Sequence, residues 1–217
     1  MSDNIDKLRS MGVNVILGQK PENIEGADMI IYTAAILKDN PELVAAEESG
    51  IPCFERADIF GAITRKFSDC IAVCGTHGKT TTTSMVSLCF IEAGLDPNIQ
   101  VGATLKQIDG NYRVGNSEYL ILESCEYKGN FLKFFPHTEI ILNIDNDHLD
   151  YYKNMDNVKN AFIKYVKLLP EDIVSDAHLE ANSLQSFPFI SGIDNAFKAD
   201  VDAFQKLEVD IGILNGT

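Results

Sequence analysis

The fold class of this chain is decided by the stretch Cys74-Gly75-Thr76-His77-Gly78-Lys79-Thr80-Thr81-Thr82. The apolar run Cys70-Ile71-Ala72-Val73 comes directly before it and is typical of a buried strand. After it, Met85, Leu88 and Cys89 recur at helical spacing, which predicts a helix over residues 83–91. A strand, a glycine-containing turn, a lysine–threonine pair and a helix, in this order, predict a phosphate-binding loop.

The residues of this loop are suited to a nucleotide triphosphate. Glycine at positions 75 and 78 lets the backbone turn tightly and bring its N–H groups close to phosphate oxygens. Lys79 would reach the β- and γ-phosphates, and the hydroxyl of Thr80 would bind Mg²⁺. Val73 stands where the common form of the motif has its first glycine. The loop predicts ATP and Mg²⁺ as cofactors, and the binding residues are Gly75, Thr76, His77, Gly78, Lys79, Thr80 and Thr81.

The composition fits a folded domain and excludes several classes of function. The chain has 217 residues, of which 45% are apolar, enough for a sizeable core. It carries 32 acidic and 18 basic residues and no basic stripe, so we expect no nucleic-acid partner. Its start shows no signal-peptide pattern and its apolar runs are strand-sized, which predicts a cytoplasmic protein with no membrane partner. Five cysteines without a Cys-x-x-Cys pair favour reduced thiols over disulfides or zinc.

Predicted helices and strands alternate with short connections, which indicates a parallel sheet covered by helices. Before the loop we expect helices at residues 5–11, 41–48 and 57–66 and strands at 13–17, 29–32 and 51–54. After it we expect a hairpin arm at 112–118 with its turn at 110–111, strands at 119–122 and 139–144, and a helix at 158–169. A strand–turn–strand is expected at 199–209. A new unit begins near Phe67, so the predicted domains are residues 1–66 and 67–217.

Polar residues follow both predicted strands that come after the loop. Glu123 ends the first strand, and the run 143–150, which includes His148, ends the second. The carboxyl ends of parallel strands are where such sheets bind their ligands. A carboxylate there suits Mg²⁺, and His148 could hold a second ion or a phosphate-bound water. Each residue alone also has an ordinary interpretation: Glu123 as a solvated strand end, His148 as a turn residue, and Asp147 and Asp150 as helix caps.

Three motifs together resemble the Mur ligase family. They are Gly-Thr-His-Gly-Lys-Thr-Thr-Thr-Thr-Ser-Met at residues 75–85, Glu-Ser-Cys-Glu-Tyr at 123–127, and Asn-Ile-Asp-Asn-Asp-His-Leu-Asp-Tyr at 143–151. Residues 23–28, 40–44 and 50–52 are similar to the end of the family's UDP-binding domain. The resemblance covers residues 1–170. It implies an α/β fold, with a partial Rossmann-like unit at 1–66 followed by a P-loop ATPase-type central domain with a mostly parallel sheet.

The resemblance also implies an activity. Family members of this kind are ATP-dependent ligases of peptidoglycan precursor synthesis, and the substrates implied here are UDP-N-acetylmuramate and L-alanine. The substrate carboxylate is phosphorylated, and the amine attacks the acyl phosphate. The resemblance names Lys79, Glu123 and His148 as catalytic residues and Thr80, Glu123 and His148 as metal ligands.

Other residues receive less direct roles from the resemblance. Glu126 and Asn143 would order the site, with Asn143 among the nucleotide-binding residues. His77 would face a phosphate or the muramyl carboxylate, or else shape the turn. Some relatives carry a carbamylated lysine, and Lys164 lies in the corresponding region, although a solvated helix position is the favoured interpretation.

The chain departs from the family pattern at both ends. Compared with the family pattern, we expect this chain to lack the glycine-rich turn that binds the UDP pyrophosphate and the C-terminal domain that delivers the amino acid. We therefore expect a fragment that is not competent alone and that has a complementing fragment of the same enzyme as a partner. Two alternatives stay open: another Mur-type amide ligase, of the muropeptide-recycling or folylpolyglutamate type, or a non-catalytic Mg-ATP-binding fragment.

Overall fold

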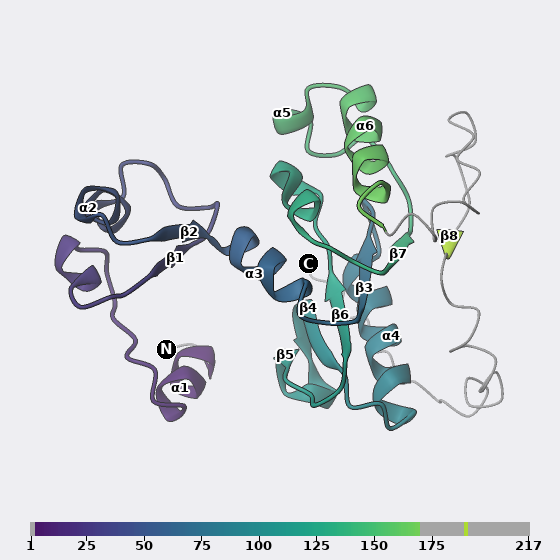
Figure 1. Ribbon diagram of the computed structural model, residues 1–217, viewed down its shortest axis with the longest axis horizontal. Coiled ribbons are helices and arrows are strands. Elements are labelled where there is room, and N and C mark those ends of the chain that lie inside the picture. Colours follow the sequence, from purple (N-terminus) through teal and green to yellow (C-terminus); the bar gives the residue numbers. More distant parts are fainter. Residues whose placement is uncertain (1–2, 170–188, 191–217) are drawn as a thin grey trace, which may run out of the picture. The chain divides into compact units, whose positions relative to one another are not determined.

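A computed structural model describes residues 3–169 and 189–190 of the chain. The chain divides between residues 63 and 64 into two compact units, Met1–Ile63 and Thr64–Thr217. Figure 1 shows both units. The strand–turn–strand expected at 199–209 lies outside the described residues.

The first unit contains a two-stranded parallel sheet, formed by β1 (Ile30–Tyr32) and β2 (Cys53–Glu55). Its helices are α1 (Asp3–Ser10), the 3-10 helix η1 (Pro21–Ile24), α2 (Pro41–Ser49) and α3 (Arg56–Thr64), which ends at the unit boundary. Helix α2 begins where the Oδ1 atom of Asn40 accepts hydrogen bonds from the N–H groups of Glu42 and Leu43. It ends at Gly50, which adopts the left-handed conformation typical of a helix end.

One strand expected in this unit is absent from the described residues. Residues 13–17 form no strand, and Val13, Ile16 and Leu17 are 45%, 52% and 66% exposed. The residues have the right character for a strand, but a strand also needs a neighbour to bind its backbone groups. Within the described residues, this segment pairs with neither β1 nor β2. The prediction at 13–17 was therefore wrong.

The second unit is built on a mixed sheet with strand order β5-β4-β6-β3-β7-β8. The strands are β3 (Asp69–Cys74), β4 (Asn98–Leu105), β5 (Gly110–Arg113), β6 (Tyr119–Glu123), β7 (Thr138–Ile141) and β8 (Phe189–Ile190). The four inner strands β4, β6, β3 and β7 are parallel, and the two edge strands are antiparallel to their neighbours. The predicted α/β fold with a mostly parallel sheet is confirmed.

Helices cover both faces of this sheet (Figure 1). The helices of this unit are α4 (Lys79–Glu92), η2 (Lys106–Ile108), η3 (Tyr127–Lys133), α5 (Leu149–Tyr152) and α6 (Met155–Val166). The ring of Tyr119 contacts Phe90 of α4, whereas Ser124 is hydrogen-bonded to Tyr165 of α6. Alternate residues along a strand point to opposite faces, so α4 and α6 pack on opposite sides. The strand β3, with its fully buried Ala72, Val73 and Cys74, lies in the core between them.

The hairpin at the sheet edge differs from the prediction in register. Strand β5 contains the two residues, 110–111, that were expected to form the turn. The chain turns earlier, through η2 and Asp109, which has a φ of 49° and so takes the left-handed conformation. The partner strand β4 was not predicted. None of the helices in the described residues is long and apolar enough to cross a membrane.

Candidate functional site

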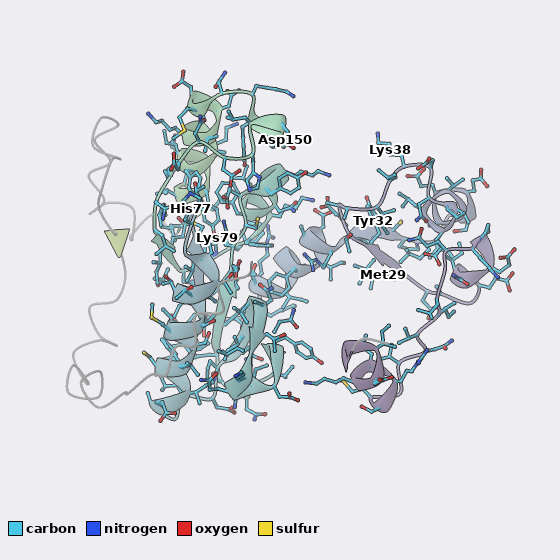
Figure 2. All side chains as sticks on the ribbon, turned by 180° about the vertical axis from the view of Figure 1, so that it is seen from behind. Met29, Tyr32, Lys38, His77, Lys79 and Asp150 are labelled. Carbon is cyan, nitrogen blue, oxygen red and sulfur yellow. The ribbon has the colours of Figure 1, made fainter. Side chains whose placement is uncertain are left out.

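The predicted phosphate-binding loop lies between a strand and a helix, as expected. Strand β3 ends at Cys74 and helix α4 begins at Lys79, so residues 75–78 form the turn. Gly78 is the residue before the helix and has a φ of 83°, where a side chain would be strained. The 14-residue helix α4 directs its free N–H groups and its positive dipole end toward the loop. Figure 2 shows His77 and Lys79 together at this end of the helix.

Gly75 is required by a close approach of two backbones. Its φ is 128°, and a Cβ atom there would lie 2.9 Å from the carbonyl oxygen of Asn143. Asn143 follows β7, which is the neighbour of β3 in the sheet. The absence of a side chain at position 75 therefore lets the loop lie directly against the segment that follows β7.

Asn143 fixes the loop through side chain and backbone. Its Oδ1 accepts a hydrogen bond from the N–H of His77 (2.8 Å), and its Nδ2 donates to the carbonyl oxygen of His77 (3.0 Å). Its own carbonyl oxygen accepts from the N–H of Thr76 (3.1 Å). The hydroxyl of Thr76 in turn accepts from the N–H of Asp145 (2.9 Å). Four hydrogen bonds thus join the loop to residues 143–145.

The ammonium of Lys79 lies inside the loop. Its Nζ atom donates to the carbonyl oxygens of Gly75 (2.6 Å) and Thr76 (3.3 Å). It also lies 3.0 Å and 3.2 Å from the two carboxylate oxygens of Glu126. The pair is largely shielded from water, since the side chains of Lys79 and Glu126 are 13% and 2% exposed. In a site of this kind an ion pair is stronger than on the surface.

Glu126 connects the loop to His148, which lies in the polar segment after β7. The Nε2 atom of His148 lies 3.8 Å from the Oε1 atom of Glu126. The hydroxyl of Tyr152 donates to the backbone carbonyl oxygen of Glu126, and the ring of Tyr127 packs against the His148 ring at 4.9 Å. The structure therefore brings Lys79, Glu126 and His148 together. Glu126 was given only a secondary role from the sequence.

The proposed metal ligands come from neighbouring parts of the sheet. Glu123 ends β6 and His148 follows β7, and these strands run parallel on either side of β3. The Oε2 atom of Glu123 accepts a hydrogen bond from the N–H of Gly102 (2.7 Å). Within the described residues, no three His, Cys, Asp or Glu side chains are grouped to hold a metal ion. A metal site that joins Thr80, Glu123 and His148 stays a prediction.

The remaining predicted residues lie around the loop. His77 is exposed, with its Nε2 atom 3.9 Å from a carboxylate oxygen of Asp145. Thr80 is half-buried in the first turn of α4, and Thr81 is exposed. Asp150 lies in the first turn of α5, where an acidic residue favours the helix (Figure 2). His148 precedes α5 with a φ of 53°, and its N–H donates to the Oδ1 atom of Asp147 (2.7 Å).

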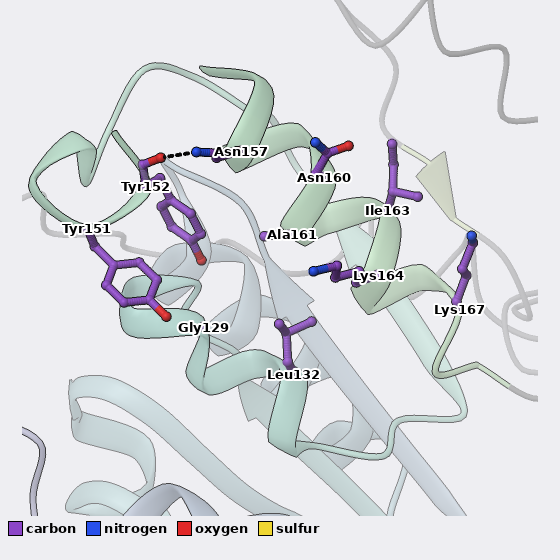
Figure 3. Close-up of a pocket in the computed structure, with 10 residues that line it drawn as sticks. All are labelled: Gly129, Leu132, Tyr151, Tyr152, Asn157, Asn160, Ala161, Ile163, Lys164 and Lys167. Atoms are coloured by element: carbon purple, nitrogen blue, oxygen red, sulfur yellow. Dashed lines mark hydrogen bonds between the residues drawn. The ribbon is translucent and has the colours of Figure 1, made fainter. Parts of the chain in front are cut away.

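An open pocket of about 700 Å³ lies between η3, α5 and α6 (Figure 3). Its wall includes Tyr152, whose hydroxyl donates a hydrogen bond to the backbone carbonyl oxygen of Glu126. Asn157 also lines it and donates a hydrogen bond to the carbonyl oxygen of Tyr152 (2.7 Å). Lys164 extends from α6 into this pocket and is exposed, which fits the solvated position favoured from the sequence.

A second buried carboxylate lies on the α6 side of the sheet and had no sequence signal. Glu139 of β7 is 2% exposed, and neither carboxylate oxygen has a hydrogen-bond partner within the described residues. Burial raises the pKa of Glu139 from 4.5 to about 8. The pKa values of Cys74 and Tyr165 are also raised, first by burial and then by the charge of Glu139. Glu139 of β7, Cys74 of β3 and Tyr165 of α6 thus influence one another electrostatically in the buried interior.

Two family models match the chain. The one described as the Mur ligase middle domain matches residues 73–187, more than half of the chain. The one described as the catalytic domain of the Mur ligase family matches residues 1–68.

Curated relatives that match this chain share one enzyme name. The UDP-N-acetylmuramate–L-alanine ligase of Clostridium botulinum (strain Langeland) is 51% identical over 181 residues, which are 83% of this chain and 40% of the relative. The enzyme of that name from Acetivibrio thermocellus is 48% identical over 172 residues, which are 79% of this chain and 37% of the relative. The chain therefore spans about 40% of the length of the relatives it matches.

Solved structures agree with these matches. The UDP-N-acetylmuramate–alanine ligase MurC of Thermotoga maritima has a TM-score of 0.72 and 31% identity, over 77% of this chain and 40% of that one. A Neisseria meningitides ligase named for UDP-N-acetylmuramate and a tripeptide also has a TM-score of 0.72, over 78% of this chain and 58% of that one. Its sequence identity is 22%, so this likeness shows the fold alone. The family matches, the shared fold and the loop geometry lead to one conclusion: this chain belongs to the Mur ligase family.

Proposed function

We propose that this chain forms the ATP-binding part of a ligase that joins L-alanine to UDP-N-acetylmuramate. The observation that carries the proposal is the 51% identity, over 83% of the chain, to relatives named for this reaction. A match of 181 residues in a chain of 217 necessarily includes residues 74–148, which contain the loop, Glu123 and His148. This identity favours the alanine-adding ligase over another Mur-type amide ligase and over a non-catalytic fragment.

The loop fits a triphosphate. The N-terminal end of α4 offers N–H donors and a positive dipole end, which together favour a bound phosphate. Lys79 adds a full positive charge, and because its side chain is only 13% exposed, water screens this charge little. The hydrogen bonds from Asn143 hold the loop in this shape before any ligand binds. A preformed site loses less conformational entropy on binding than a flexible one.

The oxygen donors near the loop fit Mg²⁺. The hydroxyl of Thr80 lies in the first turn of α4, and the carboxylate of Glu123 lies at the end of β6. In phosphate sites Mg²⁺ usually takes only one or two protein carboxylates, together with phosphate oxygens and waters. A cluster of three acidic side chains is therefore not needed. When bound, the ion neutralises charge on the phosphates, and His148 is proposed as a further ligand.

The proposed reaction makes modest chemical demands on the protein. The γ-phosphoryl group of ATP passes to the substrate carboxylate, ADP leaves, and the amine of L-alanine then displaces phosphate to form the amide. Phosphoryl transfer depends mainly on charge neutralisation and alignment. Lys79 and the N-terminus of α4 would supply the charge, and Asn143 would maintain the alignment.

The proposal is tested first by calorimetry of the 217-residue chain with ATP and Mg²⁺, which should detect binding. The matched part of the Clostridium botulinum relative can then be replaced with this chain. The chimaera should release phosphate from ATP only when UDP-N-acetylmuramate and an amino acid are both present. Release should be faster with L-alanine than with Gly or D-Glu. The Lys79→Ala chimaera is the negative control. A folded chimaera that releases no phosphate would contradict the proposal.

A further inference from the structure

The ammonium of Lys79 is fully engaged with protein atoms. It contacts four acceptors: two loop carbonyl oxygens at 2.6 and 3.3 Å, and both carboxylate oxygens of Glu126 at 3.0 and 3.2 Å. An ammonium has three N–H donors. A phosphate oxygen can therefore bind Lys79 only after one of these contacts is released.

The contact with Glu126 differs in kind from the contacts with the loop. The two carbonyl groups belong to the loop itself, so they move with Lys79. Glu126 lies 47 positions further along the chain, at the start of η3, and it carries a full charge. Its carbonyl oxygen is bound by the Tyr152 hydroxyl and by the N–H of Gly129 (2.9 Å), which fixes its backbone. The carboxylate of Glu126 is thus held near Lys79 by a backbone that does not belong to the loop.

We propose that Glu126 is a positioning residue that competes with the nucleotide phosphates for the ammonium of Lys79. It acts through Lys79 and lowers the affinity of the loop for β- and γ-phosphates. The inference rests on the proposed function, since it requires that the loop binds a nucleotide. The role is distinct from that of the proposed metal ligands Glu123 and His148.

The surroundings of Glu126 allow such an exchange. When Lys79 turns to a phosphate, a buried carboxylate without a partner would be costly. The Nε2 atom of His148 lies 3.8 Å from the Oε1 atom of Glu126, and its N–H can take over the contact with a small movement, which leaves Nδ1 of the ring for the proposed metal ion. Lys79 can therefore leave Glu126 without leaving it isolated.

The test compares the nucleotide affinities of the unsubstituted chain and of Glu126→Gln, with Mg²⁺ present. Glutamine keeps the size and one acceptor oxygen but removes the charge. Affinity for ATP and for ADP should rise about five- to tenfold, because a charge-assisted contact is no longer lost on binding. Affinity for AMP, which has no β-phosphate, should not change.

Asp156→Asn is the control. Asp156 is exposed in the first turn of α6, outside the residues proposed to bind nucleotide or metal. Removing this charge should change ATP affinity by less than about twofold at ordinary salt concentration, because water and salt screen exposed charges. An equal gain in both variants would mean that general electrostatics is responsible, and the inference would be overturned.

A second comparison shows whether the effect passes through Lys79. In a Lys79→Met background, Glu126→Gln should leave ATP affinity unchanged. A gain that persists there, or an ATP affinity that is unchanged or weaker in Glu126→Gln alone, overturns the inference.

The proposed function and the inference can fail separately. If the unsubstituted chain binds no ATP, the proposed function fails. The Lys79–Glu126 pair is then tested by urea unfolding without nucleotide. The unsubstituted chain is compared with Lys79→Met, with Glu126→Gln and with the double variant. Non-additive stabilities support the pairing. Additive stabilities overturn it, whatever the nucleotide result.

Discussion

Asn143 binds both backbone polar groups of His77. Its Oδ1 accepts from the His77 N–H at 2.8 Å and its Nδ2 donates to the His77 carbonyl oxygen at 3.0 Å. Each half of the amide thus has a partner of the matching kind, which defines the orientation of the side chain. The two residues are 66 positions apart, so this pair ties the phosphate-binding loop to the end of a different strand.

Asn143→Ala should loosen the loop, because both side-chain hydrogen bonds to His77 are lost. The loss of two hydrogen bonds should lower the free energy of unfolding by about 1–3 kcal/mol, and affinity for ATP should fall about tenfold. Urea unfolding and calorimetry measure the two effects. Asn146→Ala, which removes an exposed amide three positions further on, should change both little. Unchanged ATP affinity in Asn143→Ala would contradict this role.

Gly75→Ala should disrupt the loop by a steric conflict. Its φ of 128° is unfavourable for alanine, and the new Cβ would lie 2.9 Å from the Asn143 carbonyl oxygen. Gly94→Ala is the matched control, because Gly94 has a φ of 72° but no atom within 4 Å of the added Cβ. We expect Gly94→Ala to cost about 1–2 kcal/mol of stability and Gly75→Ala to cost more, with loss of ATP binding. Equal losses of stability would argue against the close approach.

Local patterns predicted the elements around the loop because each depends on its own residues. The strand before the loop, the glycine turn and the following helix appear within a few residues of the expected positions. The segment 13–17 shows where such reasoning ends. Its apolar, β-branched residues suit a strand, but strand formation depends on a partner elsewhere in the chain, and local sequence does not reveal one.

The candidate site shows the same limit. The loop residues were predicted because the motif is contiguous, and their placement at the start of α4 follows from that. The contact of Lys79 with Glu126 joins residues 47 positions apart across two strands, and no spacing rule predicts it. The left-handed conformation of Asp109, which moved the predicted hairpin turn, also arises at a non-glycine residue that gave no clear signal.

Lys79→Ala should weaken ATP binding about tenfold or more, since a charge-assisted contact to phosphate contributes roughly 1.5–3 kcal/mol. Calorimetry with Mg²⁺ measures the change. Lys153→Ala is a suitable control, because Lys153 is an exposed lysine whose ammonium binds the carbonyl oxygen of Asp150 outside the loop. Nucleotide affinity equal to that of the unsubstituted chain would refute the assignment of Lys79.

The same substitution should also lower stability. Without Lys79, the buried carboxylate of Glu126 keeps only the nearby imidazole of His148, so the cost should be at most the roughly 3–5 kcal/mol typical of a buried pair that loses one partner. The double variant Lys79→Ala/Glu126→Gln should recover much of this loss in urea unfolding. A double variant no more stable than Lys79→Ala would show that the buried charge is not the cause.

Glu139 should make the stability of the protein depend on pH. Burial raises the pKa of its carboxyl group from 4.5 to about 8 in the folded chain, whereas in the unfolded chain the group is exposed to water. Between these two pKa values the folded protein holds a proton that the unfolded chain has released. Each rise in pH through this window therefore favours unfolding. The stabilising contribution is complete below pH 4.5 and is lost as pH rises to about 8.

Glu139→Gln removes this dependence, because glutamine fills the same space and carries no charge at any pH. The free energy of unfolding of the unsubstituted chain should fall, relative to the variant, by up to about 1.4 kcal/mol per pH unit between pH 5 and 8. The variant should therefore be the more stable protein at pH 8–9. Urea unfolding at several pH values measures the difference, and Glu92→Gln, at an exposed position on α4, keeps Glu139 and should show the same slope as the unsubstituted chain. Parallel pH profiles for Glu139→Gln and the unsubstituted chain would mean that the carboxyl group of Glu139 is ionised at neutral pH and has a partner that stabilises its charge.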